Sequence, residues 1–223
     1  MLIPRNILTY LPEKKMKLKI YGVTFEISYP LAVIMTAVII YDSSMSVLSC
    51  FVSVILHESG HLLMLRYYGC MPDRIRLTLF DIAIVDSSKP LRGTKQELTV
   101  TLAGVAVNII AGTAALIPEI FFGNDILKLF VNANLTLAFF NLLPAHTLDG
   151  GQALMIILSR KIDIRRAMLI QDILTAAVII PLGILGFLVL LRSGYNFTLL
   201  VTALYLLAVL LMKSPHINTG ENK

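Results

Sequence analysis

The stretch from about Met45 to Tyr68 is mostly apolar and long enough to cross a bilayer as one helix, which takes about 20 residues. It carries His57, Glu58 and His61. Two histidines four residues apart on a helix share one face, about 6 Å apart along the axis, so both can reach one metal ion. Glu58 follows His57 directly, where the zinc-protease pattern places the carboxylate that takes a proton from water. The stretch therefore predicts a metal site inside a membrane helix.

The same stretch has a polar stripe. Small polar residues precede the histidines at helical spacing, and the stripe consists of Ser46, Ser49 or Cys50, Ser53, His57 and His61. Polar groups inside a bilayer face protein or water, because lipid offers them no hydrogen bonds. We expect this face of the helix to be buried against other helices.

Composition extends this view to the whole chain. At 57% hydrophobic and 15% charged residues over 223 positions, the chain is too apolar for a soluble domain. The net charge of +5 would suit nucleic acid, but the basic residues fall at the ends of apolar runs, where they report orientation. We predict an all-α polytopic membrane protein of about six transmembrane helices, with a small membrane-associated β-hairpin or sheet and no nucleic-acid partner.

The spans are separated by two polar segments. Alternating residues at 16–28, broken at Tyr21 and Gly22, predict a β-hairpin at the membrane surface, and the connection 70–96 predicts one or two strands. The first apolar run is short for a span. The expected spans are 30–41, 45–68, 97–122, 126–143, 172–191 and 197–212.

Basic residues give this arrangement a direction. With six spans, every Lys and Arg except Lys128 and Arg192 falls on one side, which the positive-inside rule assigns to the cytoplasm. Both termini are then cytoplasmic in a multi-pass protein of the cell membrane. The first 29 residues lack the apolar core of a signal peptide, and we expect them to be retained. On this topology Asp149, after the fourth span, can meet His57 and His61.

A catalytic zinc ion takes three protein ligands, so two histidines leave one to find. Glu119 lies at the outer end of its span, and Glu97 is explained by its place at a helix start. Asp149 stands in a Leu-Asp-Gly-Gly turn whose glycines permit a non-helical backbone, and it is the best candidate. The alternative is that Asp149 caps a helix beginning near Gly151.

These motifs resemble the site-2 protease family of intramembrane zinc metalloproteases. That family carries His-Glu-x-x-His in one core span and Asn-x-x-Pro with Leu-Asp-Gly near the end of another. The resemblance runs from about Lys17 to about Arg160 and is closest to the stage IV sporulation protease branch. The matching residues are His57 to His61, Glu97, Leu98, Leu102 to Gly104, Asn108, and Asn141 to Gly151.

The resemblance implies a function and a set of roles. It implies a metalloendopeptidase that cleaves in or next to a transmembrane segment of a membrane-associated regulatory protein, with a regulatory membrane partner as a further expectation. In its terms Glu58 is the general base and Asn108 holds the substrate carbonyl or its oxyanion. From the residues alone, a hydrogen bond from Asn108 to a neighbouring helix is an equal alternative. The implied zinc ligands are His57, His61 and Asp149.

The domain organisation follows. We expect a cytoplasmic segment with the hairpin at 1–29, a catalytic membrane core at 30–160 with four spans and the Leu-Asp-Gly loop, and two further spans with a tail at 161–223. Two other functions stay open: a zinc or other divalent metal transporter using the same cluster, and a metalloprotease whose third ligand is Glu.

Several positions depart from the family pattern. Val105 replaces a Pro, Phe80-Asp81-Ile82 replaces Phe-Gly-Gly, and His146-Thr147 replaces an aromatic residue and Pro. His146 could touch the metal or the substrate, or could be a polar loop residue.

Two further expectations concern the surroundings of the site. Asn134 and Asn141 share a helix face and predict hydrogen bonds that support the metal ligands. The alternating segment 75–84 could pair with an unwound substrate by strand addition, or could be a surface hairpin.

Overall fold

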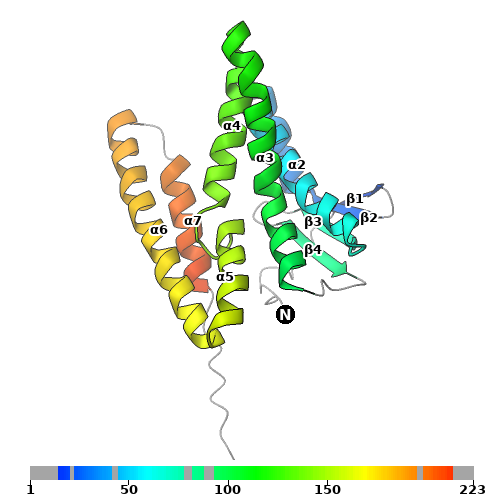
Figure 1. The fold of residues 1–223 in the computed structure, drawn as a ribbon. Coiled ribbons are helices and arrows are strands. Elements are labelled where there is room, and N and C mark those ends of the chain that lie inside the picture. Colours follow the sequence, from blue (N-terminus) through cyan, green and yellow to red (C-terminus); the bar gives the residue numbers. More distant parts are fainter. Residues whose placement is uncertain are drawn as a thin grey trace, which may run out of the picture.

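The structure, a computed structural model, describes residues 15–20, 23–41, 45–77, 82–87, 93–194 and 198–212. It is a bundle of helices with one small sheet at the side of its lower end (Figure 1). The bundle consists of α1 (Tyr29–Tyr41), α2 (Ser46–Tyr67), α3 (Thr94–Phe122), α4 (Asp125–Asn141), α5 (Asp149–Lys161), α6 (Ile164–Ser193) and α7 (Thr198–Met212).

The sheet has four strands in the order β1-β2-β3-β4. Strands β1 (Lys15–Ile20) and β2 (Val23–Ser28) form the predicted antiparallel hairpin. Strands β3 (Pro72–Leu77) and β4 (Ile82–Ser87) form a second antiparallel pair, so the connection does hold two strands. Pairing between β2 and β3 is parallel, because α1 and α2 lie between them in the chain and return it to the same end.

Among the described residues, three helices are long and apolar enough to cross a membrane: α2, α3 and α6. Helices α1, α4 and α7 are shorter, so the count of six spans stays a prediction. Helix α6 begins earlier than the expected fifth span, since Asp163 caps it by accepting a hydrogen bond from the Arg165 amide. The amphipathic stretch before it forms α5.

Helix α3 is the centre of the bundle and packs against α2, α4 and α5. Small residues allow these close approaches. A Cβ atom added at Gly60 would stand 2.7 Å from the Ala103 carbonyl oxygen, and one at Gly112 would stand 2.8 Å from the Leu135 side chain. Helices α6 and α7 pack against each other, and α6 also packs against α5 (Figure 1).

The inner face of α2 carries the predicted polar stripe. Ser49, Ser53 and His57 are buried, as expected for polar groups that avoid lipid, whereas Cys50 is exposed. This stripe aims the metal-binding motif at the interior of the bundle.

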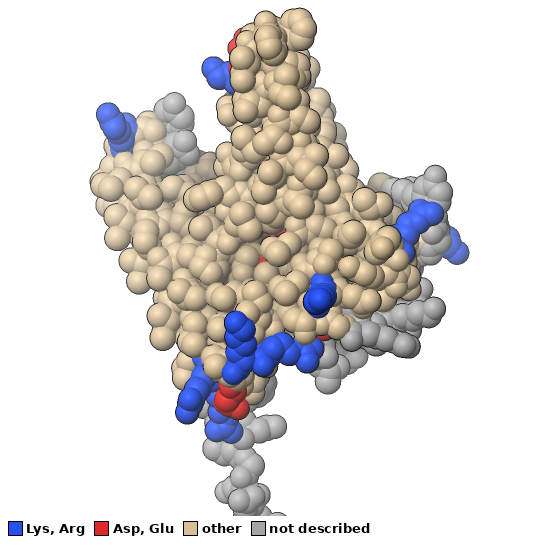
Figure 2. Space-filling view, in the orientation of Figure 1, with Lys and Arg blue, Asp and Glu red and all other residues tan. Residues whose placement is uncertain are grey.

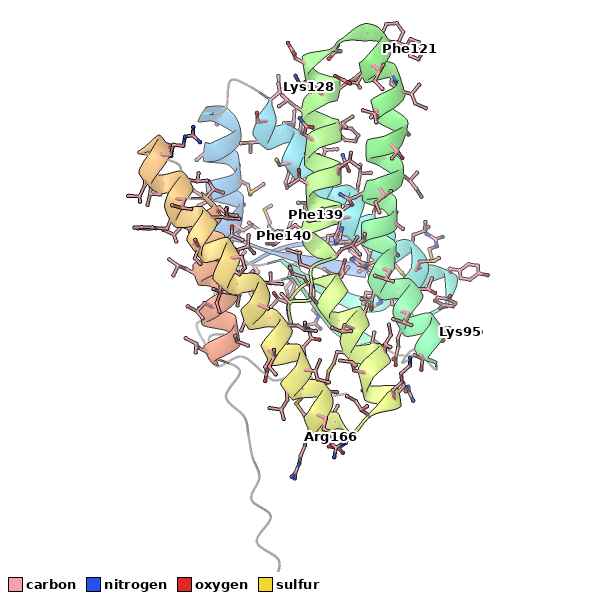
Figure 3. All side chains as sticks on the ribbon, turned by 60° about the vertical axis from the view of Figure 1, so that its left-hand side comes forward. Lys95, Phe121, Lys128, Phe139, Phe140 and Arg166 are labelled. Atoms are coloured by element: carbon pink, nitrogen blue, oxygen red, sulfur yellow. The ribbon has the colours of Figure 1, made fainter. Side chains whose placement is uncertain are left out.

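Charged side chains mark the two ends of the bundle. In Figure 2 most Lys and Arg side chains gather around the lower end and beside it, and few occupy the upper tips. Lys95 and Arg166 lie at the end opposite Lys128 (Figure 3). The long surface between the two ends carries few charged side chains (Figure 2), and large apolar side chains such as Ile110, Ile173 and Leu185 are exposed on it, as expected for a protein in a membrane.

Candidate metal centre

The two histidines of α2 lie against each other on its inner face. Their ring centroids are 4.8 Å apart and the ring planes are nearly perpendicular, at 80°. His61 Nδ1 lies 2.8 Å from the Val100 carbonyl oxygen of α3. A carbonyl only accepts, so Nδ1 is the protonated nitrogen and His61 Nε2 is left with a lone pair. The neighbouring helix thus sets the tautomer that a metal ligand needs.

Asp149, the first residue of α5, completes a triangle with these nitrogens. Its Oδ2 atom lies 3.1 Å from His57 Nε2 and 3.4 Å from His61 Nε2. The two Nε2 atoms are 3.2 Å apart. Residues nearly a hundred positions apart in the chain therefore converge on one point, as the topology predicted.

The triangle has the size of a zinc site. Tetrahedral zinc with bonds of about 2.0–2.1 Å holds its ligand atoms about 3.3 Å apart, close to all three separations. His57 and Asp149 are only 5% and 8% exposed, so the facing Nε2 and Oδ2 atoms are shielded from water and directed at one another. Within the described part of the chain, this is the one cluster of three metal-ligating side chains. The residues fit a zinc ion.

Electrostatics favour an ionised Asp149. Burial raises the pKa of its carboxyl group, but the two facing imidazoles outweigh burial and hold the pKa below its usual value. Glu58 is half-buried and close enough to both imidazoles and to Asp149 to interact electrostatically with all three. A carboxylate outside the triangle thus stands beside it, as the motif predicted for a base.

Helix α3 closes one side of the centre with a glycine. A Cβ atom at Gly104 would stand 2.4 Å from His61 Nε2 and 2.8 Å from His57 Nε2. Glycine is thus required at this position by the approach of the metal-binding nitrogens. Val105 next to it is buried, at 3% exposure, and occupies the position of the family's Pro as a packing residue.

The glycines after Asp149 act differently from the sequence prediction. Gly150 and Gly151 were expected to permit a non-helical turn, but both lie within α5. They are needed for space: Cβ atoms there would stand 2.0 Å from the Leu142 carbonyl oxygen and 1.9 Å from that of Ala145. The alternative role for Asp149 as a cap is also wrong, because Leu148 is the N-cap residue.

The predicted asparagines lie in the same interior. Asn108 is fully buried and its Nδ2 donates to the Ser53 carbonyl of α2, so the helix-to-helix bond is present, while its Oδ1 has no partner. Asn134 and Asn141 donate to Phe130 and Leu137 of their own helix. Hydrogen bonds from these two residues in support of the metal ligands were expected. The bonds observed go to backbone carbonyl oxygens of α4 instead.

His146 lies outside the triangle. Its Nε2 atom is 2.5 Å from Asp172 Oδ1 of α6, so its observed partner is a carboxylate of another helix. The neighbouring Gln171 is fully buried and donates from Nε2 to the Pro144 carbonyl at 3.4 Å. Sequence reasoning missed Gln171, although an amide within an apolar helix is a signal that it meets a polar partner.

The substituted loop lies mostly outside the described residues. Phe80 and Asp81 are among the residues not described, and Ile82 begins β4.

The chain is similar in sequence to a zinc metalloprotease and to a sporulation protein. No family model matches. The chain is 39% identical to a zinc metalloprotease of Methanocaldococcus jannaschii over 117 residues, 50% of this chain and 33% of that protein. It is 28% identical to stage IV sporulation protein FB of Bacillus subtilis over 142 residues, 62% of this chain and 49% of that protein. It thus covers about a third to a half of these relatives.

A solved structure matches nearly the whole chain. The site-2 protease from Methanocaldococcus jannaschii superposes with a TM-score of 0.64 at 26% identity, over 94% of this chain and 100% of that one. The fold is thus shared along the described helices and is not confined to the motifs.

Proposed function

We propose that the chain belongs to the site-2 protease family of intramembrane zinc metalloproteases, in line with its similarity to the proteins above, and that it hydrolyses a peptide bond in or next to a transmembrane segment of a membrane protein. One observation carries the proposal: His57, His61 and Asp149 meet inside an apolar helical bundle with separations of 3.1–3.4 Å, beside Glu58. A soluble zinc protease meets its substrate by diffusion in water, whereas this centre is reached from within the membrane.

The chemistry follows from the side chains at the centre. His57, His61 and Asp149 would hold the ion, and a zinc ion bound there would supply Lewis-acid chemistry, polarising the peptide carbonyl and making a nearby water more acidic. Glu58 takes the proton of the attacking water and later delivers it to the leaving nitrogen, so the proton balance closes on one carboxylate. Hydrolysis then ends with Glu58 in its starting state.

Binding of a membrane segment requires that its helix unwind, because peptide bonds in a helix are shielded and already hydrogen-bonded. The edge strand β4 could hold the unwound segment by strand addition, since β4 stands at the end of the sheet order. Asn108 is the candidate for contact with the substrate carbonyl. Its buried Oδ1 has no partner, and its Nδ2 already donates to Ser53, so this role requires Asn108 to exchange that bond.

The same proposal covers orientation and organisation. Because the basic side chains gather at one end of the bundle, that end faces the cytoplasm, and both termini lie there in a multi-pass protein of the cell membrane. Residues 30–160 form the catalytic core, 1–29 a cytoplasmic segment with the hairpin, and 161–223 the C-terminal spans. A membrane-associated regulatory protein is the substrate we propose, with a regulatory membrane partner.

Metal transport is not favoured. A transporter needs successive ligand sets along a path, and the described part of the chain has one such cluster. A glutamate as the third ligand is also disfavoured, because Asp149 lies within 3.4 Å of both imidazoles.

The test is a Glu58→Gln substitution with cleavage and zinc content measured together. Since glutamine keeps the shape but cannot take the proton, cleavage of a co-expressed single-span substrate should fall by about 100- to 10,000-fold while zinc stays bound. Glu119→Gln, at the far end of α3, is the matched control and should cleave normally. Undiminished cleavage by Glu58→Gln would refute the assigned base, and zinc flux in proteoliposomes that survives the substitution would favour a transporter.

A further inference from the structure

The loop that leads to Asp149 is held from the side by α6. Residues 142–148 connect α4 to α5 without a regular element. Two consecutive residues of α6 reach this loop: Gln171 donates to the Pro144 carbonyl at 3.4 Å, and Asp172 Oδ1 lies 2.5 Å from His146 Nε2. Both contacts fall within the residues that immediately precede Asp149 in the chain.

These contacts are largely shielded from water, which strengthens them. Gln171 is fully buried, and the His146 side chain is 14% exposed. Charged and polar pairs are stronger away from water, although Asp172, at 47% side-chain exposure, is partly screened. Gln171 also touches the start of α5, because a Cβ atom at Gly151 would stand 2.7 Å from its Nε2. Helix α6 therefore contacts the chain on both sides of Asp149: the loop before it and the first turn of α5 after it.

Position matters for this particular ligand. His57 and His61 are fixed by one helix, but Asp149 reaches the triangle only if the first turn of α5 is placed correctly. Displacement by about 1 Å along the line between the atoms would change the separations of 3.1 and 3.4 Å by up to about a third of their length. Thr147, between His146 and Leu148, is exposed and does not restrict its own backbone as proline would.

We propose that the His146–Asp172 pair, supported by Gln171, is a latch by which α6 positions Asp149 for metal binding. His146 and Asp172 are positioning residues, and neither is a ligand. This inference rests on the proposed zinc site but not on proteolysis, because metal affinity can be measured without any substrate. Through this contact the α6–α7 pair, which packs against α5, would influence the position of a metal ligand.

The test is a double-mutant cycle read out as zinc affinity, by chelator competition on the full chain in detergent. His146→Phe keeps a ring without the nitrogen, and Asp172→Leu keeps the size without the charge. Each should weaken zinc binding about tenfold, which is the lower end of the range of about 10- to 100-fold expected for residues that orient a metal ligand. Because both remove the same contact, the double variant should be no weaker than either single variant.

Controls separate positioning from general stability. Asp172→Asn retains an acceptor and should recover most of the affinity. Asp125→Asn, an acid in the first turn of α4, should bind zinc like the wild type. Thermal unfolding of the metal-free variants should change little.

Three outcomes would overturn the latch: unchanged affinity in the single variants, multiplied losses in the double variant, or lost stability without lost affinity. A wild type that binds zinc but cleaves no substrate would refute the proposed protease while leaving the latch to be judged by the affinities.

Discussion

The two parts of the metal centre are built in different ways. His57 and His61 stand one turn apart on α2, and the geometry of the helix alone brings them together. Asp149 stands at the start of a different helix, where α3, the connecting loop and α6 all lie close by. One part depends on a single hydrogen-bonded helix, and the other on several tertiary contacts.

Because of this difference, substitutions near the two histidines and near Asp149 should act on zinc binding in different ways. A change on α2 acts on zinc only if it removes a ligand or intrudes on one, because the helix keeps the spacing. Around Asp149, a change that touches neither zinc nor a ligand can still move the carboxylate. We therefore expect zinc binding to be sensitive only to substitutions at or beside His57 and His61 on α2. Around Asp149, we expect it to be sensitive to substitutions in several elements.

The largest effect is expected when a ligand is removed. His57→Ala and Asp149→Ala should each weaken zinc binding by roughly 100- to 1000-fold. This corresponds to the loss of about a quarter of the roughly 10–16 kcal/mol of binding free energy that a four-ligand zinc site provides. Chelator competition on the purified protein measures it. Ser59→Ala, on α2 but exposed, is the matched control and should bind zinc normally. If Asp149→Ala bound zinc as the wild type does, the two parts would not form one site.

A smaller effect is expected where α3 meets the ligands. Gly104→Ala would place a methyl group 2.4 Å from His61 Nε2, so the imidazoles must move and zinc affinity should fall about 10- to 100-fold. Gly112→Ala, on the same helix, would bring its methyl group closest to the Leu135 side chain, at 2.8 Å, and no metal ligand lies among its nearest atoms. It should cost stability of about 1–3 kcal/mol and leave zinc affinity unchanged. Equal zinc affinities in the two variants would contradict the close approach of α3.

The smallest effect on zinc affinity is expected in the first turn of α5. Gly151→Ala would bring a methyl group 1.9 Å from the Ala145 carbonyl oxygen, a backbone atom that cannot rotate away. Because the backbone must move, we expect a stability loss at the upper end of about 1–3 kcal/mol, together with weaker zinc binding as Asp149 is displaced. Gly183→Ala in α6, whose nearest atom would be 3.9 Å away, should be neutral or slightly stabilising. Loss of stability without any change in zinc affinity would separate the turn from the ligand.

The sequence predicted the α2 part of the centre almost completely. The spacing of His57 and His61 reports which face they share, and the polar stripe that includes Ser49 and Ser53 reports that this face is buried. The β-hairpin, the strands of the connection and the membrane class were predicted for the same reason, because each depends on local periodicity. Asp149 was identified by elimination and by motif, and the structure does bring it to the histidines.

What the sequence missed depends on contacts between distant segments. Glycine is needed at positions 150 and 151 because two backbone carbonyl oxygens approach these residues closely, and no local sequence pattern reveals such an approach. Pairing of His146 with Asp172 joins residues 26 positions apart on a loop and a helix, and sequence reasoning offered only the metal, the substrate or solvent as partners. Likewise the parallel pairing of β2 with β3 is set by the return of the chain through two helices.

In the proposed site one zinc ion is held jointly by α2 and α5. Anomalous scattering at the zinc edge, from crystals of the zinc-loaded wild type, tests it most directly. We expect a single strong peak about 2.0–2.2 Å from His57 Nε2, His61 Nε2 and Asp149 Oδ2. A zinc peak elsewhere, or one that contacts the histidines and Glu58 while Asp149 points away, would contradict it.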